Sequence, residues 1–179
     1  MFLTVLSGTP LSRIPVAWAP GYRFDSRTNS CYKFHTTPLI WTRAFVACAH
    51  EGGYLAIINS KLEHQLIKEL YSKSYSSIIS GNYNRGAIHL GYKSFEHLSL
   101  WMTIHGIPLS RMPVTWAPGE PDNADNSEDC LLMLPNGTLA DVNCSDVYPY
   151  VCYRKKQINM PVTHLRVVSA VATSSTQIR

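Results

Sequence analysis

Five cysteines restrict what this chain can fold into more than any other feature of its sequence. They stand at positions 31, 48, 130, 144 and 152, and no two of them form the C-x-x-C pair of a zinc or redox site. This pattern favours structural disulfides formed in an oxidising compartment. Two bridges among five cysteines can form in fifteen ways, five choices of the unpaired residue times three pairings, and spacing alone selects none of them. One thiol must remain unpaired.

The composition is that of a folded domain with extensions. With 179 residues, 45% of them apolar, the chain can bury a core, and its size predicts one domain of roughly 100 to 150 residues. No window approaches the ~20 apolar residues of a membrane span, so we expect none. The apolar N-terminus lacks a basic segment, so export is not directly encoded by a signal peptide. No basic stripe interleaved with aromatic residues indicates nucleic-acid binding.

Hydrophobic spacing predicts an α+β fold with two helices. Trp41, Ala44, Phe45 and Cys48 follow the spacing of a helix with one buried face, and Gly52 and Gly53 can end it. A second helix opens at Ser60 and Glu63, which form a capping box, and is expected to bury Leu62, Leu66 and Leu70. Short β-rich runs lie at 54–59, 87–92, 98–104, 130–134 and 150–153, and the Asn136-Gly137 pair predicts a hairpin turn.

As a set, these residues resemble the C-type lectin-like domain. The resemblance covers roughly residues 22 to 154, and its motifs are the first helix, "GGYLAIINS", "IHLGY", Trp116-x-x-Gly119 before "EPD", and the last three cysteines. It implies mostly antiparallel sheets with a long calcium- and sugar-binding loop. It also implies an outer disulfide, Cys48–Cys152, and an inner one, Cys130–Cys144. Cys31 is then either a free buried thiol or an intermolecular link.

The pattern is most similar to the humoral immune lectins of insects, which often carry two such domains. Residues 10–21, "PLSRIPVAWAPG", recur at 108–119 as "PLSRMPVTWAPG". We therefore interpret residues 1–21 as an extension resembling a fragment of an upstream lectin domain, 22–155 as the lectin-like domain and 156–179 as a loose tail.

A dense acidic segment follows the second copy of this repeat. Five of the twelve acidic residues lie within the ten residues from 120 to 129, and they offer the oxygen ligands that calcium prefers. The EF-hand spacing is absent. The resemblance implies one calcium site at Glu120, Asp122, Glu128 and Asp141, which would also bind carbohydrate, and a Glu120-Pro121 bond in the cis form.

Two positions depart from the family pattern. Asp122 replaces an asparagine, which keeps an oxygen ligand but removes an amide donor, and Ala140 replaces a second asparagine, which removes a ligand and weakens the site. A sugar hydroxyl would then lose its amide partners, at a cost of roughly 1 kcal/mol or more each. We expect weak and broad recognition of single sugars, with avidity from a second lectin domain or an oligomer.

The resemblance implies a secreted innate immune lectin that binds bacterial or fungal surface polysaccharide. The loss at Ala140 also supports an alternative, a calcium-independent lectin-like module that binds protein. An enzyme is not expected, because the seven histidines are scattered and no H-E-x-x-H motif occurs. Asn136, in the sequon Asn136-Gly137-Thr138, is a possible glycosylation site if the protein is secreted.

Overall fold

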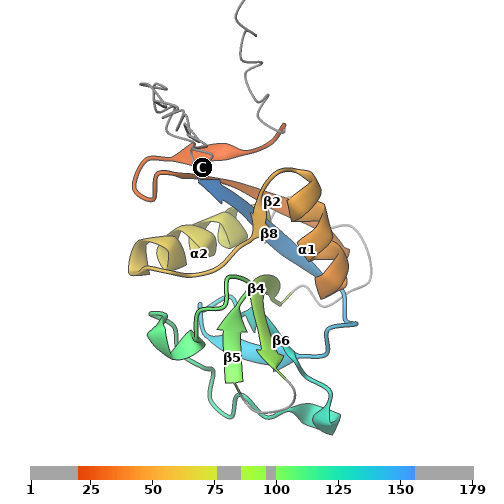
Figure 1. Ribbon diagram of the computed structural model, residues 1–179. Helices are drawn as coiled ribbons and strands as arrows, with labels where there is room; N and C mark the ends of the chain where they lie inside the picture. The colour runs from red at the N-terminus through yellow and green to blue at the C-terminus, as the bar shows by residue number, and fades with distance from the viewer. Residues whose placement is uncertain (1–19, 76–85, 96–99, 156–179) are drawn as a thin grey trace, which may run out of the picture.

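A computed structural model describes residues 20–75, 86–95 and 100–155 of the chain (Figure 1). The first copy of the repeat and the expected tail therefore lie almost entirely outside the described residues. Within these ranges, neither helix has the length and the apolar run that crossing a membrane requires.

One mixed sheet organises the domain, in the strand order β1-β2-β8-β4-β6-β7, with β3 added to β8 and β5 added to β4. Its pairs are antiparallel except for the single contact between β4 and β8. In Figure 1 the two helices flank β2 and β8, while β4 to β7 and the long loop form the other half of the molecule. The strands are β1 (Arg23–Asp25), β2 (Ser30–Leu39), β3 (Tyr54–Leu55), β4 (Ile88–Phe95), β5 (Leu100–Thr103), β6 (Cys130–Met133), β7 (Leu139–Val142) and β8 (Tyr148–Lys155). The expected α+β fold with two helices and a mostly antiparallel sheet is confirmed.

Helix α1 (Trp41–His50) buries Trp41, Ala44 and Cys48 as its spacing predicts. The Trp41 indole donates a 2.8 Å hydrogen bond to the carbonyl oxygen of Leu90, which fixes the helix against β4. Gly52 adopts a positive φ of 72°, and its N–H bonds the Ala49 carbonyl, so the glycine ends the helix as expected. The expectation for Phe45 is wrong, because that ring is 37% exposed and stacks on Trp41 at the helix surface.

Helix α2 (Lys61–Tyr75) begins with a variant of the expected capping box. Ser60 Oγ accepts the Glu63 N–H at 3.1 Å, while Glu63 accepts the N–H of Asn59 rather than that of Ser60. The predicted buried stripe is wrong at Leu62, which is 49% exposed. The buried face instead consists of Glu63, Leu66, Ile67 and Tyr71, so it is rotated toward the residues that follow Leu62, Leu66 and Leu70 in the sequence.

Each half of the domain contains one disulfide, and both pairings that the resemblance implied are confirmed. Cys48 joins α1 to β8 through a bond to Cys152, which closes a sequence separation of 104 residues. Cys130 and Cys144 close a separation of 14 residues around the β6–β7 hairpin. Cys31 belongs to neither disulfide, and its side chain is only 1% exposed.

His89 on β4 makes the domain sensitive to acid. Its ring is 0% exposed, and burial lowers its pKa to about 4 from an ordinary value of 6.5. The unfolded chain takes up this proton near pH 6.5 and the folded chain only near pH 4, so stability is lost as the pH falls between them. We expect the replacement His89→Leu to reduce the stability lost between pH 7 and pH 4.5 by about 2 to 3 kcal/mol, measured by urea unfolding. Equal pH dependence in the two proteins would contradict this role.

Candidate calcium and carbohydrate site

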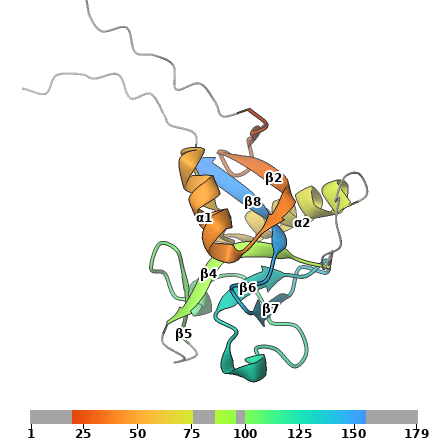
Figure 2. The same cartoon turned by 90° about the vertical axis from the view of Figure 1, so that its right-hand side faces the viewer.

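The long loop between η1 (Leu109–Arg111) and β6 carries most of the candidate site. The loop includes a second short helix, η2 (Ala124–Asn126), and lies at the end of the molecule opposite the β1–β2 hairpin (Figures 1 and 2). The second copy of the repeat starts it. Within that copy, the backbone of Thr115 and Ala117 hydrogen-bonds Leu139 of β7, and the Trp116 ring contacts Trp101 of β5. The repeat therefore fixes the loop against the sheet.

Turn geometry directs the acidic residues toward β7. The Glu120-Pro121 bond is cis, as the resemblance implied, and Asn123 adopts a left-handed conformation with φ of 47°. Asn123 Oδ1 accepts the Glu128 N–H at 3.1 Å, which closes the loop on itself. Asparagine is one of the few residues besides glycine that adopt this conformation readily, so "DNADN" held a signal for this turn that the sequence analysis did not use.

Three of the four predicted ligands converge. Carboxylate oxygens of Glu120, Asp122 and Asp141 lie within 4.8 Å of one another. Two oxygens that each lie 2.3 to 2.6 Å from one calcium ion can be at most about 5 Å apart, so this spacing fits a shared ion. Glu128 lines a small cavity together with Asp122 and Asp141, and its Oε2 accepts the Ala124 N–H at 2.8 Å. We call Glu120, Asp122, Glu128 and Asp141 the acidic cluster.

Asp141 is the buried centre of the cluster. Its side chain is held by two backbone donors, with the Asp122 N–H 3.1 Å from Oδ1 and the Asn123 N–H 2.9 Å from Oδ2. The residue is only 6% exposed, because β7 pairs it with Leu131 of β6. It therefore connects the loop to the sheet.

The cluster concentrates negative charge that the described residues do not neutralise with an ion pair. Burial, and then the neighbouring Asp141 carboxylate, raises the pKa of Glu120 to about 7. Burial also raises the pKa of Glu128, and the nearby carboxylates of Asp122 and Asp141 act in the same direction. Glu120 Oε2 is buried without a hydrogen-bond partner in the described structure. A divalent cation would satisfy this atom and relieve the repulsion.

The cavity beside the cluster has a volume of about 90 Å³. That volume is sufficient for an ion with a few waters, each of which occupies about 30 Å³ of liquid, and is too small to enclose a hexose ring. Ser94 and Trp101 also line the cavity. A sugar would therefore lie on the surface and reach the ion from outside.

The donor set determines which metal the cluster fits. Every candidate ligand is a carboxylate oxygen, which suits a hard cation such as calcium and not zinc. Ala140 offers no ligand, and it pairs with Leu132 inside the β6–β7 hairpin. A second group of neighbouring side chains, His35, Glu51 and Cys152, does not fit a metal, because Cys152 forms a disulfide.

Comparison with known proteins identifies the family. The model of the Lectin C-type domain matches residues 37–154, and the chain belongs to this family. It is a family of non-enzymatic binding proteins, so the expectation that this chain is not an enzyme is confirmed. The C-type lectin domain is thus the class to which the fold belongs.

The chain is similar to three proteins in particular. A hemolymph lipopolysaccharide-binding protein from Periplaneta americana is 36% identical over 152 residues, which are 84% of this chain and 58% of that relative. The mouse scavenger receptor C-type lectin carbohydrate-recognition domain superposes with a TM-score of 0.64 at 24% identity, covering 77% of this chain and 98% of that one. A calcium-independent type II antifreeze protein superposes with a TM-score of 0.59 at 22% identity, covering 76% and 92%. The chain spans less than two thirds of the length of the Periplaneta protein.

Proposed function

We propose that this domain binds carbohydrate through one calcium ion held by Glu120, Asp122, Glu128 and Asp141. The observation that carries the proposal is the convergence of three carboxylates within 4.8 Å around a buried Glu120 oxygen that has no partner in the described structure. Their charge offsets the ligand missing at Ala140. The expected affinity is that of extracellular modules, about 10⁻⁴ to 10⁻³ M.

Sugar recognition would follow from the same atoms. Two adjacent hydroxyls would coordinate the ion and donate hydrogen bonds to the carboxylates. Positions 122 and 140 offer no amide to donate in return, so a hydroxyl oxygen lacks the partners that would select one sugar epimer. We therefore expect weak and broad binding of single sugars, and useful retention only on surfaces that present many copies.

Microbial surface polysaccharide is the ligand class that we propose. The Periplaneta relative is named for lipopolysaccharide binding in hemolymph, and lipopolysaccharide presents many sugars on one surface. Two disulfides support secretion into such an oxidising fluid. Asn136 is exposed at the hairpin turn, where we propose that it accepts a glycan if the protein is secreted.

The test is retention on mannose, galactose and lipopolysaccharide resins, with millimolar calcium and with EGTA. We expect retention to fall at least several-fold when the chelator removes the ion, and to return when calcium is restored. In millimolar calcium, a Glu120→Gln variant should be retained no better than the wild type is retained in EGTA. Equal retention with and without EGTA on all three resins would reject calcium-dependent binding.

A second candidate function is a calcium-independent module that binds protein. The residue that favours it is Ala140, which provides no ligand where the family pattern has an asparagine. The similar antifreeze protein, described as calcium-independent, is a precedent for this fold without the ion. Flat calorimetry at millimolar calcium would favour this alternative over the proposed lectin activity.

A further inference from the structure

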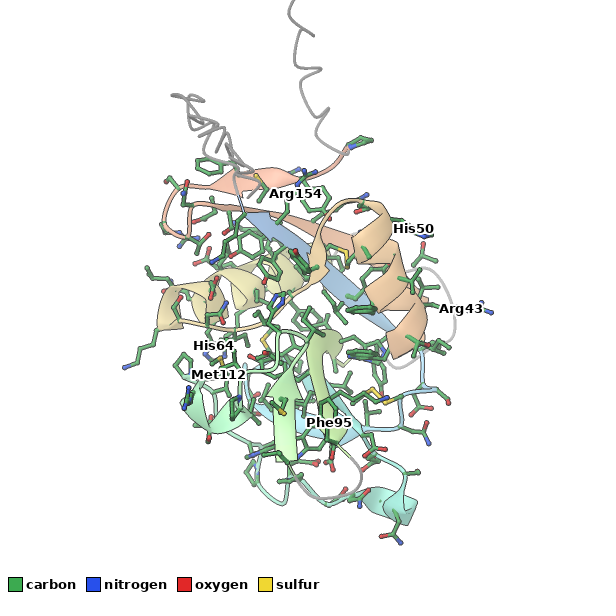
Figure 3. The ribbon with its side chains drawn as sticks, viewed as in Figure 1. Arg43, His50, His64, Phe95, Met112 and Arg154 are labelled. Carbon is green, nitrogen blue, oxygen red and sulfur yellow. A yellow bond between two sulfur atoms is a disulfide. The ribbon has the colours of Figure 1, made fainter. Side chains whose placement is uncertain are left out.

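A second cavity, of about 580 Å³, lies apart from the acidic cluster. It opens between β3, the start of α2, the turn after β5 and the end of β8, and its lining shares no residue with the cavity of the acidic cluster. Arg154, labelled in Figure 3, marks this end of β8 close to the β1–β2 hairpin. The volume is within the roughly 300 to 1,000 Å³ range of small-molecule sites.

A half-exposed aromatic ring forms one wall of this cavity. Tyr54 is 50% exposed, and its ring contacts that of His105 edge-on at a centroid distance of 4.9 Å and that of Tyr153 at 5.7 Å. His105 Nε2 and the Tyr153 hydroxyl are 2.8 Å apart, which holds the two supporting rings together. An aromatic ring fixed in this way is a preformed surface on which the C–H groups of a pyranose can pack.

Three polar groups at the rim have no hydrogen-bond or ion-pair partner among the described residues. They are the Tyr54 hydroxyl, the Asn59 side-chain amide and the Lys155 ammonium group, and all three residues are exposed. The other polar groups of the lining are already used. Arg27 bonds Asp25 and Glu69, and Glu63 caps α2. The free groups are donors and acceptors of the kind that sugar hydroxyls require.

The charge around the cavity favours a neutral ligand. Arg27 and Lys155 supply two positive charges, while Glu63 and the two carboxylates that bond Arg27 supply three negative ones. The electrostatic field in this cavity therefore nearly cancels, whereas that of the acidic cluster is strongly negative. Such a cavity favours neither a cation nor a strongly anionic ligand.

From these observations we propose that the cavity is a second carbohydrate subsite, which takes a neutral pyranose unit against Tyr54 without calcium. The Asn59 amide and the Lys155 ammonium group hydrogen-bond its hydroxyls. A polysaccharide could then contact one domain at two separate places, so weak binding at the calcium site would gain avidity from the second.

The experiment follows the His105 ring resonances by NMR during titration with methyl glycosides of glucose, galactose, mannose and N-acetylglucosamine. EGTA is present throughout, so the calcium site cannot contribute. We expect at least one glycoside to shift these resonances saturably. Tyr54→Ala should weaken that binding roughly tenfold, the loss expected for about 1.4 kcal/mol of ring packing, whereas Tyr54→Phe should stay within about threefold of wild type. Lys155→Gln, at an exposed position outside the core, should weaken it by about threefold.

Phe24→Ala is the matched control, because this ring is 49% exposed on the neighbouring β1 and does not line the cavity. It should bind like wild type, and near-ultraviolet circular dichroism should show that every variant is folded. Saturable shifts that Glu120→Gln leaves unchanged would support the subsite even if calcium-dependent retention fails. No shift with any of the four glycosides, or unchanged binding by a folded Tyr54→Ala variant, would overturn the proposal.

Discussion

Replacing Asp141 with asparagine is expected to lower calcium affinity by roughly 100-fold or more and to remove calcium-dependent retention on glycan resins. The carboxylate does two things at once. Its oxygens accept the N–H groups of Asp122 and Asn123, and it belongs to the group of oxygens within 4.8 Å that would hold the ion. An asparagine side chain has only one oxygen, so it must present its NH₂ group to one of these two backbone donors. The loop then loses an anchor as well as a charged ligand.

Calcium calorimetry and resin retention, each at fixed pH, measure this effect. Asp146→Asn is the matched control, since Asp146 is an exposed carboxylate in the nearby turn and does not line the cavity of the acidic cluster. That variant should bind calcium like wild type. If Asp141→Asn kept its calcium affinity within a few-fold of wild type, the ion would have to bind elsewhere, and the site proposed here would be wrong.

Removing the outer disulfide with the double variant Cys48→Ala/Cys152→Ala should lower the free energy of unfolding by about 4 to 5 kcal/mol. The estimate comes from the loop-closure entropy of the 104-residue separation. The inner bridge closes only 14 residues, so the double variant Cys130→Ala/Cys144→Ala should lose about 3 kcal/mol. With a total stability of ordinary size, about 5 to 15 kcal/mol, loss of the outer bridge leaves a small domain close to unfolding at body temperatures.

Urea unfolding of the wild type, the two double variants and Cys31→Ala under non-reducing conditions gives the comparison. We expect removal of the outer bridge to lower the free energy of unfolding more than removal of the inner one, because the outer bridge restricts a much longer stretch of the unfolded chain. Cys31→Ala serves as the control for losing a buried sulfur that forms no bridge. If both double variants lost no more stability than this control, the two bridges would contribute little.

The sequence indicated the elements more reliably than their buried faces. Both helices and the hairpin at Asn136-Gly137 were predicted, and five strands were predicted at or near their observed positions. The ten-residue strand β2 was missed, because "HTTPL" has no clean alternation. Pro38 lies where the register with β8 shifts between His35 and Leu39, a position that tolerates a residue without an N–H group.

The misplaced residues Phe45 and Leu62 share one cause. Periodicity reports that a helix has an apolar side, but neighbouring elements decide which residues they cover. Trp41 and Ala44 of α1 belong to one cluster of buried residues, and Ile67 and Tyr71 of α2 belong to another. Phe45 and Leu62 lie at the edges of those contacts and remain exposed.

At the candidate site, the residue types alone predict the chemistry, namely a dense set of hard oxygen ligands and a missing side-chain ligand at Ala140. The position of Asp141 on β7, beside Glu120 and Asp122 and bonded by two backbone donors, could not be predicted in this way and is seen only in the folded domain. The same holds for Tyr54, His105 and Lys155, which are far apart along the chain and line one cavity. Residue type fixes what an atom can bind, whereas the distances between atoms and their burial depend on how the whole sheet packs.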